Sequence, residues 1–250
     1  NSEVQILAKT GDIQLLGGGT NQWFTMQGAA MYLGSKSGVN GGNSSSNIIF
    51  QSDDFYLYAS SSFRFATTGT VTIRSVNNTF TDAQSLSTFT LNDNSLTMSG
   101  FTFGKSTNTS NITLDSDISA SGAVTVYGST INLYNNITSS GAGDITISAS
   151  TKIEDNTTRR SVTNSSGDIY LIADSDGVGQ LDIGYLTLDA GSDDLILRGS
   201  TFSWGTDSNT PKPYINGTGG VTIESTGTAF GQGVDARWFY WNQDSNQISS

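Results

Sequence analysis

The sequence predicts an all-β chain wound as a parallel β-helix (β-solenoid) of about eleven coils with no significant helix, on three observations. Short segments of alternating apolar and polar residues recur along the chain, most of them opened by Gly and a small or acidic residue. In the second half these segments recur at a spacing of roughly 21–26 residues, the coil length of a parallel β-helix. No stretch carries the i, i+3, i+4, i+7 apolar spacing of an amphipathic helix over several turns.

The alternating segments are predicted to be β-strands with one buried face, because successive side chains of a strand point to opposite sides. Gly and Asn between them are turn residues that tolerate positive φ. The segments are Gly11–Leu15, Gly69–Ile73, Gly122–Val126, Gly143–Ile147, Gly167–Leu171 and Gly219–Ile223, with Asp193–Leu197 as a variant that lacks the glycine.

The spacing between segments indicates coils of three short strands each. Val124, Ile145 and Ile169 follow one another at the spacing of one coil. Two further short strands, 130–134 and 136–139, fit between the first two of these positions. Coils of this length stack about 4.8 Å apart, so we expect Val124, Ile145 and Ile169 to form one interior ladder.

Composition sets limits on function. Hydrophobic residues make up 35% of the 250 residues and charged residues 13%, which favours a thin core under a neutral polar surface. The chain has no Cys and no His, which excludes disulfides, zinc sites built on Cys or His, and Ser-His-Asp or Cys-His catalysis within it. A net charge of −11 argues against nucleic-acid binding, and no apolar run is long enough to insert into a membrane.

A longer repeat overlies the coils. Residues 68–80 and 218–230 share Thr, Gly, Val, Thr, Ile, Ser and Phe at an offset of 150. Residues 1–100 accordingly resemble residues 157–250, and we interpret 1–250 as a single β-solenoid segment that is a window on a longer array. The stretch 206–217, which holds both prolines, is expected to be a loop, as is the polar stretch 156–166.

Residues 103–114 (FGKSTNTSNITL), followed by Asp117-Ile118 and Gly122–Gly128, resemble the coils of large repetitive bacterial surface proteins of the filamentous-haemagglutinin type. The resemblance implies a right-handed β-helix at the bacterial cell surface or in the extracellular medium. It carries no catalytic motif, so no functional residue is transferred to this chain. The chain differs from these surface proteins in being richer in aromatic residues.

One candidate metal site is the acidic group Asp174, Asp176 and Asp182. Aspartates that alternate with small residues on a tight loop can supply the oxygen ligands that Ca²⁺ requires. The residue twelve positions along an EF-hand-like loop is Tyr185 rather than the required Glu, and the other interpretation is a solvated turn between strands. No other cofactor is expected.

The candidate binding residues are Trp238 and Tyr240. They alternate with Phe239 and Trp241, so one pair faces the core and the other faces outward. At an offset of 150, Phe239 and Trp241 match Phe89 and Leu91, which predicts that Trp238 and Tyr240 are the outward pair. Exposed aromatic rings can stack on sugars or form a protein interface.

We therefore expect an extracellular, non-catalytic rod: a surface fibre, an adhesin repeat region or a biofilm matrix component. Its partners would be copies of itself in a filament, together with surfaces or glycans. The alternative is a carbohydrate-binding or polysaccharide-cleaving β-helix protein, such as a lyase or a tailspike. A groove that holds three or more acids near an aromatic residue would favour that alternative.

Overall fold

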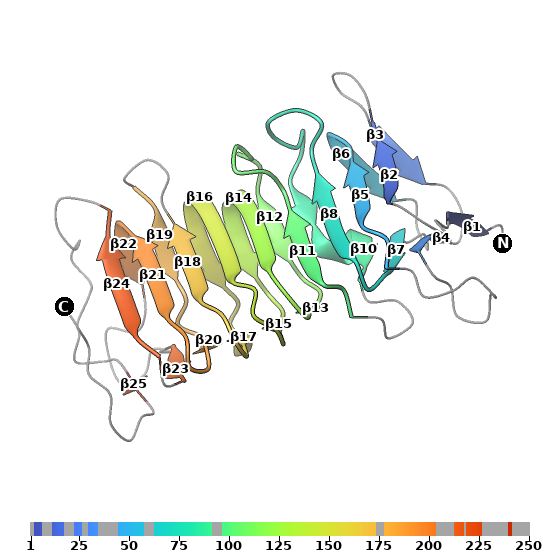
Figure 1. Cartoon of the computed structure of the whole chain (residues 1–250). Helices are drawn as coiled ribbons and strands as arrows, with labels where there is room; N and C mark the ends of the chain where they lie inside the picture. Colours follow the sequence, from blue (N-terminus) through green and yellow to red (C-terminus); the bar gives the residue numbers. More distant parts are fainter. Residues whose placement is uncertain are drawn as a thin grey trace.

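The protein is a parallel β-solenoid, in which strands stack coil upon coil along one axis (Figure 1). The computed structural model describes residues 3–6, 12–17, 23–26, 30–34, 45–57, 63–91, 97–173, 178–203, 213–217, 219–226 and 240–241. Every strand pair among these residues is parallel. Strands β1 and β2 lie at one end of the stack and β24 at the opposite end.

The first face of the coil is a main sheet in which nine strands follow one another. They are β2 (Ile13–Leu16), β5 (Ile48–Gln51), β8 (Thr70–Arg74), β11 (Gly100–Phe103), β14 (Val124–Leu133), β16 (Ile145–Asp155), β18 (Ile169–Ala173), β21 (Leu195–Gly199) and β24 (Val221–Ser225). The expectation of eleven coils was therefore too high. Two early coils are longer than the predicted spacing, because the steps from Ile13 to Ile48 and from Val71 to Phe101 exceed every step after Val124.

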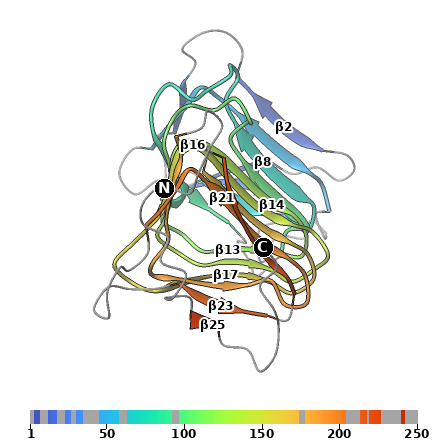
Figure 2. The ribbon, with the colours of Figure 1, turned by 90° about the vertical axis from the view of Figure 1, so that its left-hand side faces the viewer.

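Two further faces close each coil, which gives the rounded triangular outline seen along the axis in Figure 2. The second face holds β3 (Trp23–Met26), β6 (Asp54–Leu57), β9 (Gln84–Ser85), β12 (Ile112–Leu114), β19 (Gln180–Asp182), β22 (Thr201–Ser203) and the second halves of β14 and β16. The third face holds β1 (Glu3–Ile6), β4 (Ala30–Gly34), β7 (Phe63–Ala66), β10 (Phe89–Thr90), β13 (Ile118–Ala120), β15 (Ile137–Ser139), β17 (Arg160–Asn164), β20 (Leu186–Asp189), β23 (Tyr214–Asn216) and β25 (Tyr240–Trp241).

The predicted interior ladder is confirmed. Val124 is in register with Ile145 and Ile145 with Ile169, and all three side chains are buried. The row extends along all nine strands of the main sheet: Ile13, Ile48, Val71, Phe101, Val124, Ile145, Ile169, Leu195 and Val221. Stacked apolar side chains of this kind bury one another along the axis, so each coil depends on its neighbours for a core.

The corner between the first and second faces lies inside single strands. Strand β14 runs from one face to the next, and its pairing with β16 shifts register between Gly128 and Thr130. A Cβ atom at Gly128 would lie 3.0 Å from side-chain atoms of Ile112 and Ile131, so the corner leaves little room for a larger residue. The bulge turns the chain while both halves of the strand keep their pairing.

Helix is almost absent from the described residues, which contain only the 3-10 turn Leu86–Thr88. None of these residues forms a helix long and apolar enough to cross a membrane. Two predicted loops are partly strand: β17 lies within 156–166, and β23 within 206–217. In β17 the apolar residue of Ser161-Val162-Thr163 alternates with polar ones, but the polar composition of the whole stretch hides this short pattern.

The long repeat remains a prediction. Its two signature segments both contribute a strand to the main sheet, β8 and β24, and Val71 and Val221 both lie in the interior row. Ile73 is buried and Ile223 is half-buried against the core. Phe80 is buried, whereas its predicted equivalent Phe230 lies outside the described residues.

Candidate functional site

A carboxyl group occupies a core position at the end of β16. Strand registers place Leu114, Leu133 and Asp155 in one row of the second face, and both leucines are fully buried. Asp155 thus stands where the two preceding coils have leucine, and its side chain is half-buried. Its Oδ2 accepts a hydrogen bond from the backbone N–H of Tyr185. That bond holds the carboxyl at the corner between the second and third faces.

The surroundings of Asp155 favour its protonated form. Burial raises the pKa of Asp155 to about 7, and the nearby carboxylates of Asp182 and Glu154 add to the rise. The hydrogen bond from the Tyr185 backbone and the charge of Arg159 act in the opposite direction, since each stabilises the carboxylate. A carboxyl group that titrates near neutral pH can both donate and accept a proton, which is the property of a general acid or base.

Two further acids flank this group on the outward side of the second face. Glu154 and Asp182 are in register on adjacent coils, and the Nζ of Lys152 contacts both, at 3.5 Å from Asp182 Oδ2. Burial lowers the pKa of Lys152, but the hydrogen bond and charge of Glu154, with those of Asp182, outweigh it and leave the pKa raised. Lys152 therefore stays charged and neutralises part of the acidic cluster formed by Glu154, Asp155 and Asp182.

The third face adds a cation and an exposed ring beside Asp155. The guanidinium carbon of Arg159 lies 3.7 Å from the centroid of the Tyr214 ring, and Arg159 Nη1 donates a hydrogen bond of 3.1 Å to the carbonyl oxygen of Leu186. Tyr214 begins β23 and is 46% exposed. We call Asp155, Arg159 and Tyr214 the corner site; it joins a carboxyl, a guanidinium and a phenol ring across three successive coils.

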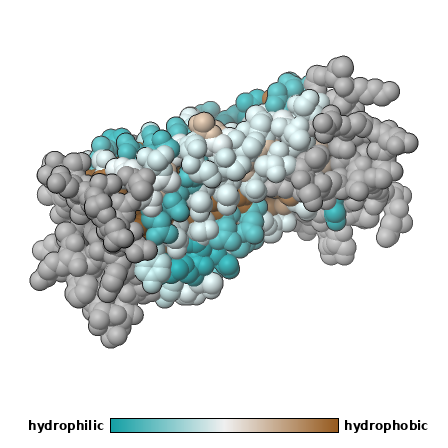
Figure 3. All heavy atoms as spheres, turned by 60° about the horizontal axis from the view of Figure 1, so that its bottom comes forward, coloured by the Kyte–Doolittle hydropathy of each residue, from teal (hydrophilic) through white to brown (hydrophobic). Residues whose placement is uncertain are grey.

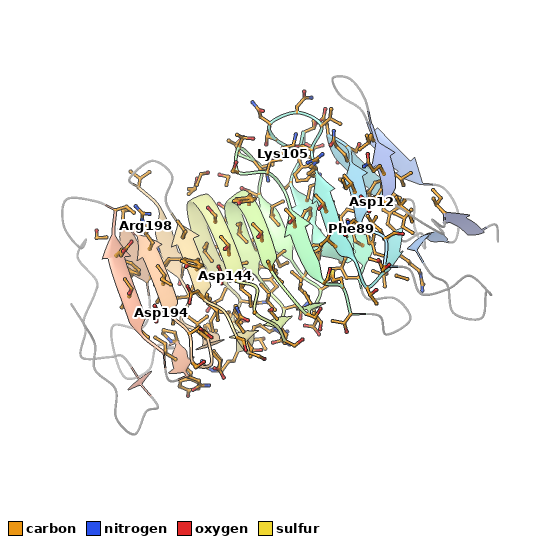
Figure 4. All side chains as sticks on the ribbon, viewed as in Figure 1. Asp12, Phe89, Lys105, Asp144, Asp194 and Arg198 are labelled. Atoms are coloured by element: carbon orange, nitrogen blue, oxygen red, sulfur yellow. The ribbon has the colours of Figure 1, made fainter. Side chains whose placement is uncertain are left out.

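A second group of acids lies at the turn before the main sheet and has a structural role. Asp144, Asp168 and Asp194 occupy equivalent positions on three consecutive coils, and Figure 4 shows Asp144 and Asp194 on the same side of the sheet. Asp144 Oδ1 accepts the backbone N–H of Asp168, Asp168 Oδ1 that of Asp194, and Asp194 Oδ1 that of Gly220, at 2.9 to 3.1 Å. Each carboxylate thereby ties its coil to the next.

The same device recurs at the other end of the solenoid and at a second turn. Asp12 Oδ1 accepts the backbone N–H of Asn47, and Asn47 Oδ1 accepts that of Thr70. On the third face, Asp117 accepts from the backbone N–H of Asn136, which in turn accepts from that of Ser161. Aspartate and asparagine at these turns therefore satisfy backbone donors.

The described structure contains one of the three residues predicted as a metal site, Asp182. Asp174 and Asp176 lie outside the described residues. Asp182 lies in β19 and forms an ion pair with Lys152, so its carboxylate already faces a cation. Within the described residues no group of three or more Asp, Glu, His or Cys is arranged to hold a metal ion.

The predicted aromatic residues are placed in part. Trp238 lies outside the described residues, whereas Tyr240 and Trp241 form β25 on the third face. Backbone register pairs Tyr240 with the exposed Tyr214 and Trp241 with the buried Ile215. The backbone of β25 therefore belongs to the coil that follows Tyr214.

Sequence reasoning missed Asp155, Arg159 and Tyr214 as a group. Asp155 could have been noticed, because an acid follows the alternating stretch of β16 at a position where the preceding coil has Leu133. The proximity of Arg159 and Tyr214 could not be predicted, since they lie far apart in the sequence and the predicted loops covered both.

Comparisons with known proteins identify no relative of this chain. No protein-family model matches it, and neither the curated proteins nor the solved structures give a significant match.

Proposed function

We propose that the protein is an extracellular structural or adhesive β-solenoid rod, a surface fibre or adhesin repeat region at the bacterial cell surface, without catalytic activity. The observation that carries this proposal is the unbroken interior row through nine strands, with turn carboxylates that link four consecutive coils. A chain organised in this way is quasi-one-dimensional, and its length can change by whole coils without a change of architecture.

The outer surface supports a role in which no single site dominates. The face shown in Figure 3 is mostly hydrophilic or neutral where the residues are described. On the main sheet, Thr72, Thr102, Thr125 and Thr146 form a continuous outward row of hydroxyl side chains on four consecutive strands. Such a surface suits a rod that stays hydrated along its length and associates with copies of itself or with an external surface.

Removal of one coil tests the rod directly. Deletion of residues 124–144 joins Ala123 to Ile145 and leaves Phe101 to stack on Ile145 in place of Val124. We expect a folded rod shortened by about 4.8 Å, measured by small-angle scattering and electron microscopy. Deletion of 124–133 alone removes two of the three faces of that coil and is the control, which we expect to aggregate. A full-coil deletion that unfolds as readily as this partial deletion would contradict the proposal.

The alternative is a carbohydrate-binding or polysaccharide-cleaving protein, and the acidic cluster with Tyr214 is the observation that favours it. Three carboxyl groups influence one another's charge here, one of them titrates near neutral pH, and Arg159, whose charge acts on Asp155, stacks on the exposed Tyr214 ring. Cleavage would release new reducing ends or unsaturated products from a panel of neutral and acidic polysaccharides. We expect the parent chain to show no more cleavage than the Asp155→Asn variant. Cleavage by the parent that this substitution abolishes would contradict the non-catalytic role and support the enzymatic alternative.

A further inference from the structure

We propose that the corner site, formed by Asp155, Arg159 and Tyr214, binds a neutral saccharide chain with the Tyr214 ring as its stacking surface. This inference names the target class of the adhesive role proposed above and rests on that role.

The Tyr214 ring projects from a part of the third face where the neighbouring outward side chains are small. In the outward row of the third face its neighbours on the two preceding coils are Thr187 and Ser161. Both side chains are much smaller than a phenol ring, so Tyr214 projects beyond them and is 46% exposed. The backbone of Tyr240 is in register with Tyr214 on the following coil. Rings that project in this way are suited to the flat C–H face of a pyranose.

Arg159 holds the ring in place before any ligand binds. Its guanidinium carbon lies over one face of the Tyr214 ring, 3.7 Å from the centroid, so a sugar would stack on the opposite face. Its Nη1 donates a hydrogen bond of 3.1 Å to the Leu186 carbonyl oxygen. A side chain fixed at both points loses little freedom on binding, which favours affinity. A guanidinium carries several N–H donors in one plane, so it can bond to protein acceptors and to a sugar hydroxyl at the same time.

Charge selects a neutral ligand. The chain has a net charge of −11, and Glu154 and Asp182 lie near Asp155 on the adjoining face, so a polyanionic saccharide would be repelled. Asp155, with a pKa of about 7, is partly protonated at neutral pH and can donate to one hydroxyl or accept from another. A ring face with mixed donors and acceptors around it matches the chemistry of a neutral hexose chain.

Calorimetric titration of the full chain with cellohexaose and with chitohexaose tests the site. We expect saturable binding of at least one of them, weakened roughly tenfold or more by Tyr214→Thr, as for aromatic residues at the centre of other binding sites. Arg159→Lys keeps the charge but loses the planar stack, and we expect it to weaken binding several-fold. Tyr170→Thr is the matched control, since Tyr170 is an outward tyrosine in register with Thr146 on the main sheet, and it should leave affinity unchanged.

The outcomes separate this site from the rod. The proposed site is contradicted if neither oligosaccharide binds at millimolar concentration, or if Tyr214→Thr and Tyr170→Thr lose affinity equally. The coil-deletion experiment tests the proposed rod independently. Shortened oligosaccharides after incubation would overturn the non-catalytic role and leave the site as the place of binding. Far-ultraviolet circular dichroism of each variant shows whether a loss of binding comes from a loss of fold.

Discussion

Two segments of the solenoid fill the same interior in different ways. In residues 48–103, the Phe-rich segment, the core is made largely by phenyl rings: Phe50, Phe55, Phe63, Phe65, Phe80, Phe89, Phe101 and Phe103, all buried. In residues 124–199, the aliphatic segment, the sequence contains no Phe and the core consists mainly of Ile, Leu, Val and Ala.

The rings of the Phe-rich segment connect the faces of the coil across the interior. Phe50 of β5 has ring centroids of Phe55 and Phe63, from the other two faces, at 4.6 and 4.9 Å. Phe89 of β10, labelled in Figure 4, lies 5.2 Å from Phe55 and 5.9 Å from Phe103. Edge-to-face geometry dominates these contacts, as expected for aromatic pairs.

The aliphatic segment depends instead on regular stacking along the axis. The steps between its main-sheet strands are all shorter than the step from Val71 to Phe101 in the Phe-rich segment. In this segment the short branched side chains stack on the equivalent residues of the coils above and below them. In the Phe-rich segment large rings reach across the interior to the other faces of the coil. One solenoid can therefore be held together by contacts across the coil or by contacts along the axis.

Truncation of a residue in each segment tests this difference and should have the largest effect. Phe50 and Ile147 lie in the same interior row, and both are fully buried. We expect Phe50→Ala to lower the free energy of unfolding by about 3–5 kcal/mol, because it removes ring contacts to two other faces. Ile147→Ala should cost less, about 2–3 kcal/mol. Urea denaturation followed by circular dichroism measures both; an equal or larger loss for Ile147→Ala would contradict the comparison.

The turn carboxylates provide a smaller test within the aliphatic segment. Asp168 accepts the backbone N–H of Asp194 and the hydroxyl of Tyr170, at 2.9 and 2.7 Å. We expect Asp168→Ala to lower the free energy of unfolding by about 1 kcal/mol, since the Asp194 N–H loses its acceptor.

Asp168→Asn is the matched control for that substitution. It keeps an acceptor oxygen and removes one of three stacked charges. An Asn at such a turn, Asn47, already accepts the backbone N–H of Thr70 just before the Phe-rich segment. We expect it to be as stable as the parent or more so, with the gain greatest at low salt. The hydrogen bond to Asp168 raises the pKa of Tyr170 to about 12, so either substitution should lower that pKa, measured by ultraviolet titration. Equal losses of stability in both variants would show that charge, not hydrogen bonding, links these coils.

Asp155 gives the smallest expected effect and the clearest dependence on pH. Its pKa is about 7 in the folded chain, above the value of about 3.9 for an unfolded aspartate. The folded state therefore binds more protons between these values, and the contribution of this group to stability is full below about pH 4 and lost as pH rises through 7.

Asp155→Asn removes this dependence, and its Oδ1 can still accept the Tyr185 N–H. At about pH 8 the variant should be more stable than the parent by less than about 1 kcal/mol, since the carboxyl is only half-buried and water screens it. At about pH 4 the two should be equal. Thermal unfolding across this pH range measures the difference, and a constant difference at all pH values would contradict the assignment.

The interior side of the main sheet was predictable because its information is local. Alternation at Val124-Thr125-Val126 and its recurrence at Ile145 and Ile169 specify both the strand and the row, since strand geometry leaves only two directions for a side chain. Turn aspartates were predictable for the same reason, because each precedes a strand by one residue. The long early coils were not, because residues that bulge out of a coil leave the alternation of the strands unchanged.

By itself, the sequence determined the fold class, the interior row of the main sheet and the structural character of the recurrent aspartates, all of which follow from short-range patterns. Only the tertiary structure decided which residues meet between coils. Asp155, Arg159 and Tyr214 meet across three coils, and their proximity depends on the exact register of β16, β17, β20 and β23 and on the bulge at Gly128. Register between distant strands results from the packing of the whole core, which no local pattern records.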